Sequence, residues 1–341
     1  MLELVNIVKK FNISGNKEDE RVALDHVSLQ IKPGEFITVI GGNGSGKSTT
    51  LNVISGALAP DSGKVLLNGF DTSKNPEYKK AAYFGRVFQD PMVGTAANMS
   101  VYENLEIAYA RGRTHKPYKW GFSASHKKYF IEELKKFDLE LEDRMDQKVG
   151  VMSGGQRQAL TLLMATMRQM PSERVIKRDY VRFCEGDKEQ AKAEVLEGFK
   201  AAKEERKQAL EAIKSLPKEE KKAKKEEIKQ EYIKKISKFD LTQQILLLDE
   251  HTAALDPKTA AKVLEITEKV VKDNNMTTIM VTHNMKDAIR YGDRLIMMSH
   301  GKVVVDVSRE KKQKLTVEQL LNMFQVASKD DTMSDSAILG D

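Results

Sequence analysis

The sequence predicts an α/β fold in which a parallel β-sheet is covered on both faces. Short apolar segments such as "FITVI" (36–40) and "QILLLD" (244–249) alternate along the chain with helical patterns, as buried parallel strands do. The chain has 341 residues, 40% of them hydrophobic, which favours one elaborated domain over two independent ones.

Hydrophobic periodicity and turn residues place each element of this fold. We expect strands at 2–8, 22–31, 36–40, 63–68, 83–88, 244–248, 276–281, 293–298 and 302–306. We expect helices at 47–56, 100–110, 126–139, 154–169, 258–273 and 315–326.

A glycine-rich segment, "GGNGSGKST" (41–49), follows the strand at 36–40 and opens a helix. We call it the phosphate loop, because this spacing in a strand–loop–helix context turns backbone N–H groups toward phosphate oxygens. Lys47 is expected to reach the β- and γ-phosphates, and the Ser48 hydroxyl to hold Mg²⁺. The predicted nucleotide ligands in this loop are Gly41, Asn43, Gly44, Ser45, Gly46, Lys47, Ser48 and Thr49.

Two adjacent carboxylates, Asp249 and Glu250, end the apolar run "ILLLDE". Beside a phosphate loop, an acid at the end of another buried strand is the expected second half of a magnesium site. We therefore assign Asp249 to the metal and Glu250 to the catalytic role of polarising the attacking water.

A second anion site is indicated by "MSGGQRQ" (152–158), which we call the signature segment. Ser153, Gly154, Gly155 and Gln156 would bind phosphate at a helix N-terminus, and one nucleotide uses both sites only where two chains meet. The chain at this point resembles the ATP-binding subunits of ABC transporters. The phosphate loop, the signature segment, "ILLLDE", "AALD" and "VTHNM" follow one another in that family's order.

The resemblance implies further site residues. Phe11 in "VKKF" would stack on adenine, and Gln89 in "VFQD" would be a catalytic residue that also senses Mg²⁺. His283 would contact the γ-phosphate, and Asp256 would cross the interface of a homodimer that encloses two ATP molecules. Phe11 could instead be a strand-edge core residue. His251 stands where the family usually has proline; it is either a neutral replacement in a loop or a residue that tunes Glu250.

Ninety-three positions separate Gln156 from Asp249, far more than one helix and a short connection need. Residues 171–240, the insertion, hold 20 of the 56 Lys and Arg residues and 16 of the 50 Asp and Glu residues. Apolar residues recur in it at helical spacing before and after Pro217. We expect a charged helical hairpin whose basic face is solvated or docks on an acidic partner or membrane surface.

Composition excludes several classes of protein. A net charge of +6, of which +4 lies in the insertion, gives no basic stripe for nucleic acid. The apolar runs are too short to cross a membrane, and one cysteine, Cys184, forms no internal disulfide and fits a reducing compartment. The chain has a single set of motifs, unlike translation-factor ABC proteins, which have two. Its insertion follows the signature segment, unlike that of chromosome-maintenance ATPases, which precedes it.

The pattern is most similar to bacterial importers assigned to tryptophan or tyrosine uptake. It implies an ATPase at the cytoplasmic face of the membrane, working with separate permease subunits and an extracytoplasmic substrate-binding protein. A regulatory or scaffold ATPase without membrane partners is the alternative. The resemblance implies an antiparallel β subdomain and a helical subdomain beside the mixed-sheet core. We expect an ATP-binding core at 1–90, a helical signature subdomain at 91–170, the insertion at 171–240, a second core segment at 241–310, and a C-terminal helix with a flexible tail at 311–341.

Overall fold

The computed structural model describes residues 1–12, 20–81, 83–110, 124–137, 140–167, 173–183, 186–239 and 245–327. Contacts divide the chain into two compact units. The sheet unit comprises Met1–Gln169 and Gln244–Asp341, and the helical unit comprises Met170–Gln243. Each unit is described by itself.

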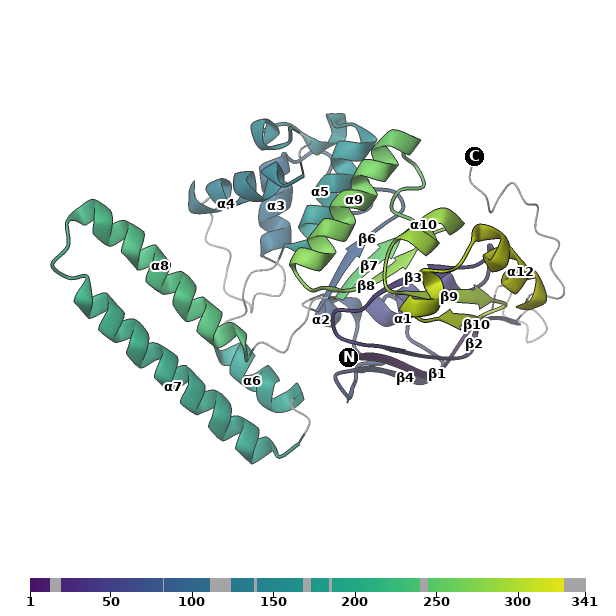
Figure 1. The fold of residues 1–341 in the computed structure, drawn as a ribbon, viewed down its shortest axis with the longest axis horizontal. Helices are drawn as coiled ribbons and strands as arrows, with labels where there is room; N and C mark the ends of the chain where they lie inside the picture. Colours follow the sequence, from purple (N-terminus) through teal and green to yellow (C-terminus); the bar gives the residue numbers. More distant parts are fainter. Residues whose placement is uncertain are drawn as a thin grey trace. The chain divides into compact units, whose positions relative to one another are not determined.

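A six-stranded mixed sheet forms the centre of the sheet unit (Figure 1). Its strand order is β10-β9-β3-β8-β7-β6, and only β10 pairs antiparallel to its neighbour. Because β3 and β7 run parallel with β8 between them, their carboxyl ends lie at the same edge of the sheet. The strands are β3 (Phe36–Ile40), β6 (Phe84–Val87), β7 (Ile245–Asp249), β8 (Thr277–Val281), β9 (Arg294–Ser299) and β10 (Lys302–Val307).

A second, antiparallel sheet has the order β2-β1-β4-β5. Its strands are β1 (Leu2–Asn12), β2 (Glu20–Ile31), β4 (Ser62–Leu67) and β5 (Phe70–Asp71). Helix α1 (Lys47–Ser55) lies between the two sheets, since its buried Leu51, Val53 and Ile54 share one hydrophobic cluster with strands of both. This packing fixes the helix that the phosphate loop opens.

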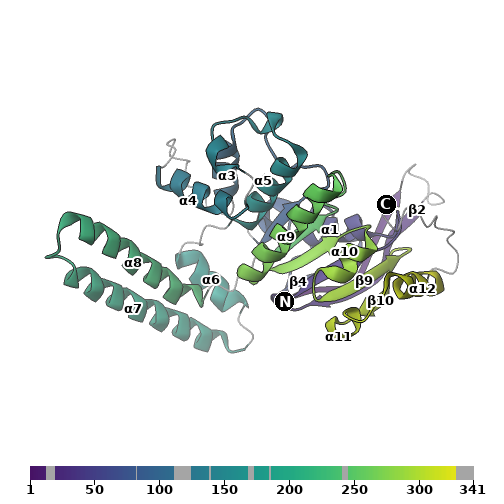
Figure 2. The same ribbon diagram turned by 45° about the horizontal axis from the view of Figure 1, so that its top comes forward.

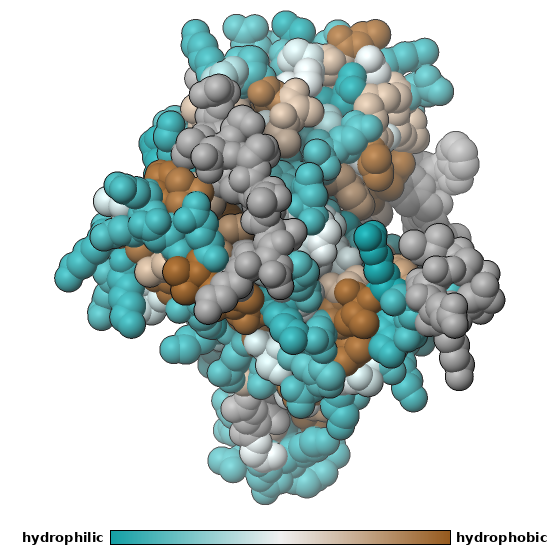
Figure 3. Space-filling view, turned by 90° about the vertical axis from the view of Figure 1, so that its right-hand side faces the viewer, coloured by the Kyte–Doolittle hydropathy of each residue, from teal (hydrophilic) through white to brown (hydrophobic). Residues whose placement is uncertain are grey.

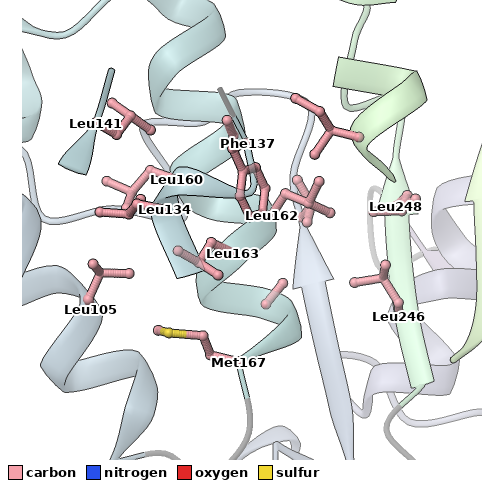
Figure 4. Close-up of a cluster of buried hydrophobic side chains, with 14 of the residues drawn as sticks. Leu105, Leu134, Phe137, Leu141, Leu160, Leu162, Leu163, Met167, Leu246 and Leu248 are labelled. Atoms are coloured by element: carbon pink, nitrogen blue, oxygen red, sulfur yellow. The ribbon is translucent and has the colours of Figure 1, made fainter. Parts of the chain in front are cut away.

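Helices cover the other face of the six-stranded sheet, as Figures 1 and 2 show for α9 and α10. The side chains of β7 alternate between the two faces of the sheet. Ile245 and Leu247 belong to the hydrophobic cluster that contains α1, whereas Leu246 and Leu248 belong to the cluster formed with the covering helices, such as α5. Figure 4 shows this cluster around the leucines of α5. The covering helices are α3 (Val101–Tyr109), α4 (Ala124–Lys135), α5 (Gly154–Thr166), α9 (Pro257–Asp273) and α10 (Met285–Arg290).

The chain after the sheet forms α11 (Arg309–Lys312) and α12 (Val317–Ala327), and α12 buries Leu320 and Phe324. The tail expected after this helix lies outside the described residues. On the face in Figure 3, hydrophilic side chains cover most of the surface and hydrophobic ones form separate patches. Within the described part of the chain, no helix is both long and apolar enough to span a membrane.

The predicted α/β fold with a mixed sheet and an antiparallel sheet is confirmed. All nine expected strands are present, and β1 extends to Asn12 through register shifts in its pairing with β2. Three short helices were not predicted: α2 (Glu77–Lys80), α10 and α11. Each has six residues or fewer, which is too short to show helical periodicity.

The helical unit contains α6 (Glu173–Phe183), α7 (Lys188–Ala212) and α8 (Lys218–Ser237). Helices α7 and α8 contact each other, and Pro217 is the N-cap of α8. Helix α6 was not expected: its Ile176 and Tyr180 complete a small core with residues of α7 and the segment around α8. The other members of that core are Ala191, Val195, Phe199, Ala202, Tyr232, Ile236 and Phe239.

The separate core of the helical unit predicts that the sheet unit tolerates its removal. Replacing residues 173–239 with a short Gly/Ser linker should leave the ATP hydrolysis expected from the sequence within about threefold, because the core described for the helical unit contains no residue of the sheet unit and long insertions between elements are well tolerated. Steady-state ATPase assays of the purified protein test this. Loss of nucleotide binding, or an unfolded product by circular dichroism, would show that the sheet unit depends on the insertion.

Candidate functional site

The phosphate loop connects β3 to α1 through glycines in left-handed backbone conformations. Gly44 has φ +77° and Gly46, the N-cap of α1, has φ +102°. A Cβ atom on Gly46 would lie 2.7 Å from the backbone oxygen of Ala23, so no other residue fits there. The loop therefore holds its backbone N–H groups at the N-terminus of α1, where anions bind.

Lys47 is buried at the start of α1, and its ammonium group donates to the carbonyl oxygens of Gly41 at 2.8 Å and Gly42 at 3.0 Å. Burial lowers the pKa of Lys47, and the charges of Glu250 and Asp249 raise it in part. In the same loop, the Ser45 hydroxyl is buried and has no hydrogen-bond partner among the described residues. A buried donor without a partner fits a loop built for a phosphate oxygen.

Asp249 ends β7 beside the phosphate loop. Its Oδ1 accepts a hydrogen bond from the Ser48 hydroxyl at 3.2 Å, and its Oδ2 lies 3.3 Å from Nη2 of Arg86 on β6. Two adjacent oxygen ligands from a hydroxyl and a carboxylate match the preference of Mg²⁺. The residues present therefore fit the magnesium ion that the sequence predicts.

Glu250 directly follows β7 and contacts His283, which follows β8. Oε1 of Glu250 lies 2.5 Å from Nε2 of His283. Burial raises the pKa of Glu250, but the contact with His283 and the charges of His283 and Lys47 lower it more, so its pKa lies below the usual value. Glu250 has φ +47°, and such a conformation costs a non-glycine residue about 1 kcal/mol or more. Strain of this kind is often retained at functional sites.

The signature segment begins α5 with a capping box. The Ser153 hydroxyl accepts from the backbone N–H of Gln156 at 3.3 Å, and the Gln156 side chain accepts from the N–H of Ser153 at 3.4 Å. Asp256 is the N-cap of α9, and its side chain accepts a hydrogen bond from the backbone N–H of Thr259 at 3.1 Å. The hydrogen bonds from Thr259 lower the pKa of the exposed Asp256. These two helix starts pack against each other: a Cβ atom on Gly154 or Gly155 would meet Leu255 or Thr259.

The structure brings together Lys47, Ser48, Asp249, Glu250 and His283 through the contacts and charges above. In the part of the chain that the structure describes, the hydrogen bonds and ion pairs of that group do not include Phe11, Gln89, Asp256 or the signature segment. Phe11 is 38% exposed on β1, with its ring 5.8 Å from the Lys9 ammonium group. Gln89 is exposed, and its side chain has no hydrogen-bond partner among the described residues.

Comparison with known proteins identifies the family. A family model described as ABC transporter matches residues 24–172. The tyrosine transport ATP-binding protein of Clostridioides difficile is 35% identical over 329 residues, which are 96% of this chain and 100% of that protein. This chain belongs to the ABC transporter ATP-binding proteins. It is an ABC ATPase, and the family resemblance stated from the motifs is confirmed.

Two further relatives are more distant. The methionine import ATP-binding protein MetN of Corynebacterium glutamicum is 26% identical over 307 residues, 89% of this ABC ATPase and 61% of MetN. A solved dimeric structure of a post-hydrolysis state of the ATP-binding cassette MJ0796, bound to ADP and Pi, has a TM-score of 0.57 at 23% identity. It covers 91% of this chain and 99% of that one, and it shows that the two share a fold.

Three site-shaping residues of this ABC ATPase were missed from the sequence. Arg86 contacts Asp249, and its guanidinium carbon lies 4.6 Å from the centroid of the Phe88 ring. Gln158 on α5 is fully buried and donates to the carbonyl of Phe88 at 3.3 Å, which ties α5 to the backbone next to Gln89. The signal for Arg86 was a charge inside the apolar strand "YFGRVF". Gln158 and Thr259 gave none, because their roles depend on tertiary contacts.

His251, the residue after Glu250 in this ABC ATPase, is 2% exposed and lies 3.3 Å from the Thr267 hydroxyl on α9. Thr267 itself donates to the carbonyl of Val263, so the imidazole Nε2–H is the donor to Thr267. Burial lowers the pKa of His251 to about 4. The imidazole is therefore neutral when the protein is folded at neutral pH.

His251 predicts a loss of stability in acid. Its pKa is about 4 in the folded chain against an ordinary 6.5, so the unfolded chain binds the proton first as the pH falls. The stabilisation is complete above about pH 6.5 and is lost down to about pH 4, by about 3 kcal/mol in all. Denaturant unfolding at pH 7 and pH 4.5 should show a smaller loss for His251→Leu than for the wild type. Equal losses would contradict the assignment.

Proposed function

We propose that this chain is the ATP-hydrolysing subunit of an ABC importer that forms a homodimer around two ATP molecules. The observation that carries the proposal is the gathering of Lys47, Ser48, Asp249, Glu250 and His283 at the carboxyl edge of the sheet. The dimeric, ADP-bound relative supports a dimer. The signature segment would complete the nucleotide site of the partner, since it is not joined to the site of its own chain.

In the proposed mechanism, Lys47 leaves the carbonyls of its loop and binds the β- and γ-phosphates. Ser48, Asp249 and Gln89 would hold Mg²⁺, which would neutralise charge developing on the phosphates. Glu250 is ionised at neutral pH because its pKa is low, so it orients and polarises the attacking water. His283 passes from Glu250 to the γ-phosphate, and Phe11 stacks on the adenine.

The transport role requires partners that span the membrane, and exposed apolar side chains on the surface of the sheet unit are candidate contacts for them. Val93 is 66% exposed, Ile107 55% and Val151 69%. The segment that begins after Gln89 contains the first two. We infer that this surface transmits the motion of ATP binding to separate permease subunits, and that the chain lies at the cytoplasmic face of the membrane.

The cargo we propose is an aromatic amino acid, delivered by an extracytoplasmic substrate-binding protein. The support is the full-length similarity to a tyrosine transport ATP-binding protein. Cargo specificity resides in the membrane and binding-protein subunits, so no residue of this chain is expected to contact the amino acid.

Co-purification tests the transport role. The tagged chain, extracted from its native membranes in detergent, should carry a protein with several membrane-spanning segments, and membranes containing both should take up tyrosine in an ATP-dependent manner. Val93→Glu with Val151→Glu should reduce the association while ATP hydrolysis by the purified chain persists. An active ATPase that binds no membrane subunit would favour the regulatory or scaffold alternative.

A further inference from the structure

Gly155 of the signature segment has no backbone reason to be glycine. It is the second residue of α5 and is absent from the residues with positive φ, so an alanine would fit its helical conformation. Glycine in a helix costs about 1 kcal/mol relative to alanine. A second glycine at the start of α5 therefore needs another explanation.

The neighbour of Gly155 within the same chain supplies one. A Cβ atom on Gly155 would lie 2.2 Å from Cγ2 of Thr259, the third residue of α9. Thr259 cannot easily move or rotate its side chain, because its backbone N–H and its side chain both form hydrogen bonds with Asp256 at the cap of α9. At Gly154 the nearest atom to such a Cβ is Cδ2 of Leu255 at 3.3 Å, the far end of a flexible side chain.

We propose that Gly155 and Thr259 lock the signature segment to the cap of α9 within one chain. Thr259 is then a positioning residue: it holds Asp256 at a fixed place relative to Ser153, so that one chain presents both to its partner as a preformed surface. This proposal rests on the dimeric function proposed above. It differs from the explanation that glycine is needed only for close approach of the backbone to the partner's nucleotide.

The locked pair predicts a rescue by a second substitution. Gly155→Ala should weaken ATP-dependent dimerisation at least about tenfold and lower the melting temperature, since overpacking displaces α5 from α9. Thr259→Ser removes Cγ2 and keeps the hydroxyl and N–H. In that background, adding Gly155→Ala should change dimerisation by less than about threefold, so the double-mutant cycle should show strong coupling.

Thr259→Val is the matched control, because it keeps both branches at Cβ and replaces the hydroxyl with a methyl group. In the Val background, Gly155→Ala should remain as damaging as in the wild type. Dimerisation is measured by analytical ultracentrifugation with ATP in the Glu250→Gln chain, and thermal unfolding is measured without nucleotide.

The two readouts separate this proposal from the dimeric function. If the Glu250→Gln chain itself never dimerises with ATP, the proposed function fails, and rescue of the melting temperature by Thr259→Ser still tests the contact. If Gly155→Ala leaves the melting temperature unchanged, or damages dimerisation equally in the Ser and Thr backgrounds, the locked pair is refuted. In that case the glycine serves the partner's nucleotide.

Discussion

Glu250→Gln is expected to keep ATP binding and to lose ATP turnover by roughly 10²- to 10⁴-fold, the usual contribution of a positioned acid–base group. Gln has the same size and can still accept from His283, but it has no charge with which to polarise water. The ammonium group of Lys47 remains in place to bind phosphate. Dimers containing unhydrolysed ATP should therefore accumulate. The measurements are steady-state hydrolysis and sedimentation of the purified chain with ATP.

The control is Glu265→Gln, the same chemical change at a 63%-exposed side chain on α9, where Arg290 is 3.8 Å away. Exposed pairs of this kind contribute about 0 to 1 kcal/mol, so its activity should match the wild type. If Glu250→Gln hydrolyses ATP at the wild-type rate, Glu250 does not polarise the water and the assignment of the two acids is wrong.

Lys47→Ala is expected to lose ATP affinity by roughly 10- to 100-fold, because hydrogen bonds to charged groups are worth about 1.5 to 3 kcal/mol. Among the described residues, the buried ammonium group of Lys47 forms hydrogen bonds only with two loop carbonyls. It can exchange them for phosphate oxygens. Equilibrium titration with a fluorescent ATP analogue measures the change.

Two controls accompany Lys47→Ala. Lys269→Ala, at an exposed position of α9, should bind ATP as the wild type does. The melting temperature of Lys47→Ala without nucleotide should show that the phosphate loop still folds. A folded Lys47→Ala chain with unchanged affinity would mean that the nucleotide binds elsewhere.

The strands of the fold could be predicted because their residues carry local signals. The run "FITVI" of β3 is apolar except for Thr38, and all five of its residues are buried, so it was recognisable without tertiary information. Helix α6 was missed although it is amphipathic, because it lies within the highly charged insertion and its Ile176 and Tyr180 share a core with residues of α7 and α8 that are distant in sequence. Helix α10 depends on the Asn284 cap and runs for six residues.

The site also contains some residues that local sequence signals predict and others whose roles depend on tertiary contacts. Lys47, Ser48 and Asp249 were predictable because a motif places each one at a fixed point relative to a strand. The contact of His283 with Glu250 could not be foreseen, because it depends on β8 lying beside β7. The roles of Arg86, Gln158 and Thr259 follow from neighbours that are distant in sequence.

The central claim, that two chains share each nucleotide site, is tested most directly by mixing two inactive variants. Lys47→Ala lacks a phosphate ligand, and Ser153→Arg blocks the signature segment, so each alone should show almost no hydrolysis. A mixed dimer contains one site with an intact Lys47 from one chain and an intact Ser153 from the other. The account predicts partial recovery of ATP hydrolysis in the mixture. Complete inactivity, in a mixture proven to contain the mixed dimer, would contradict it.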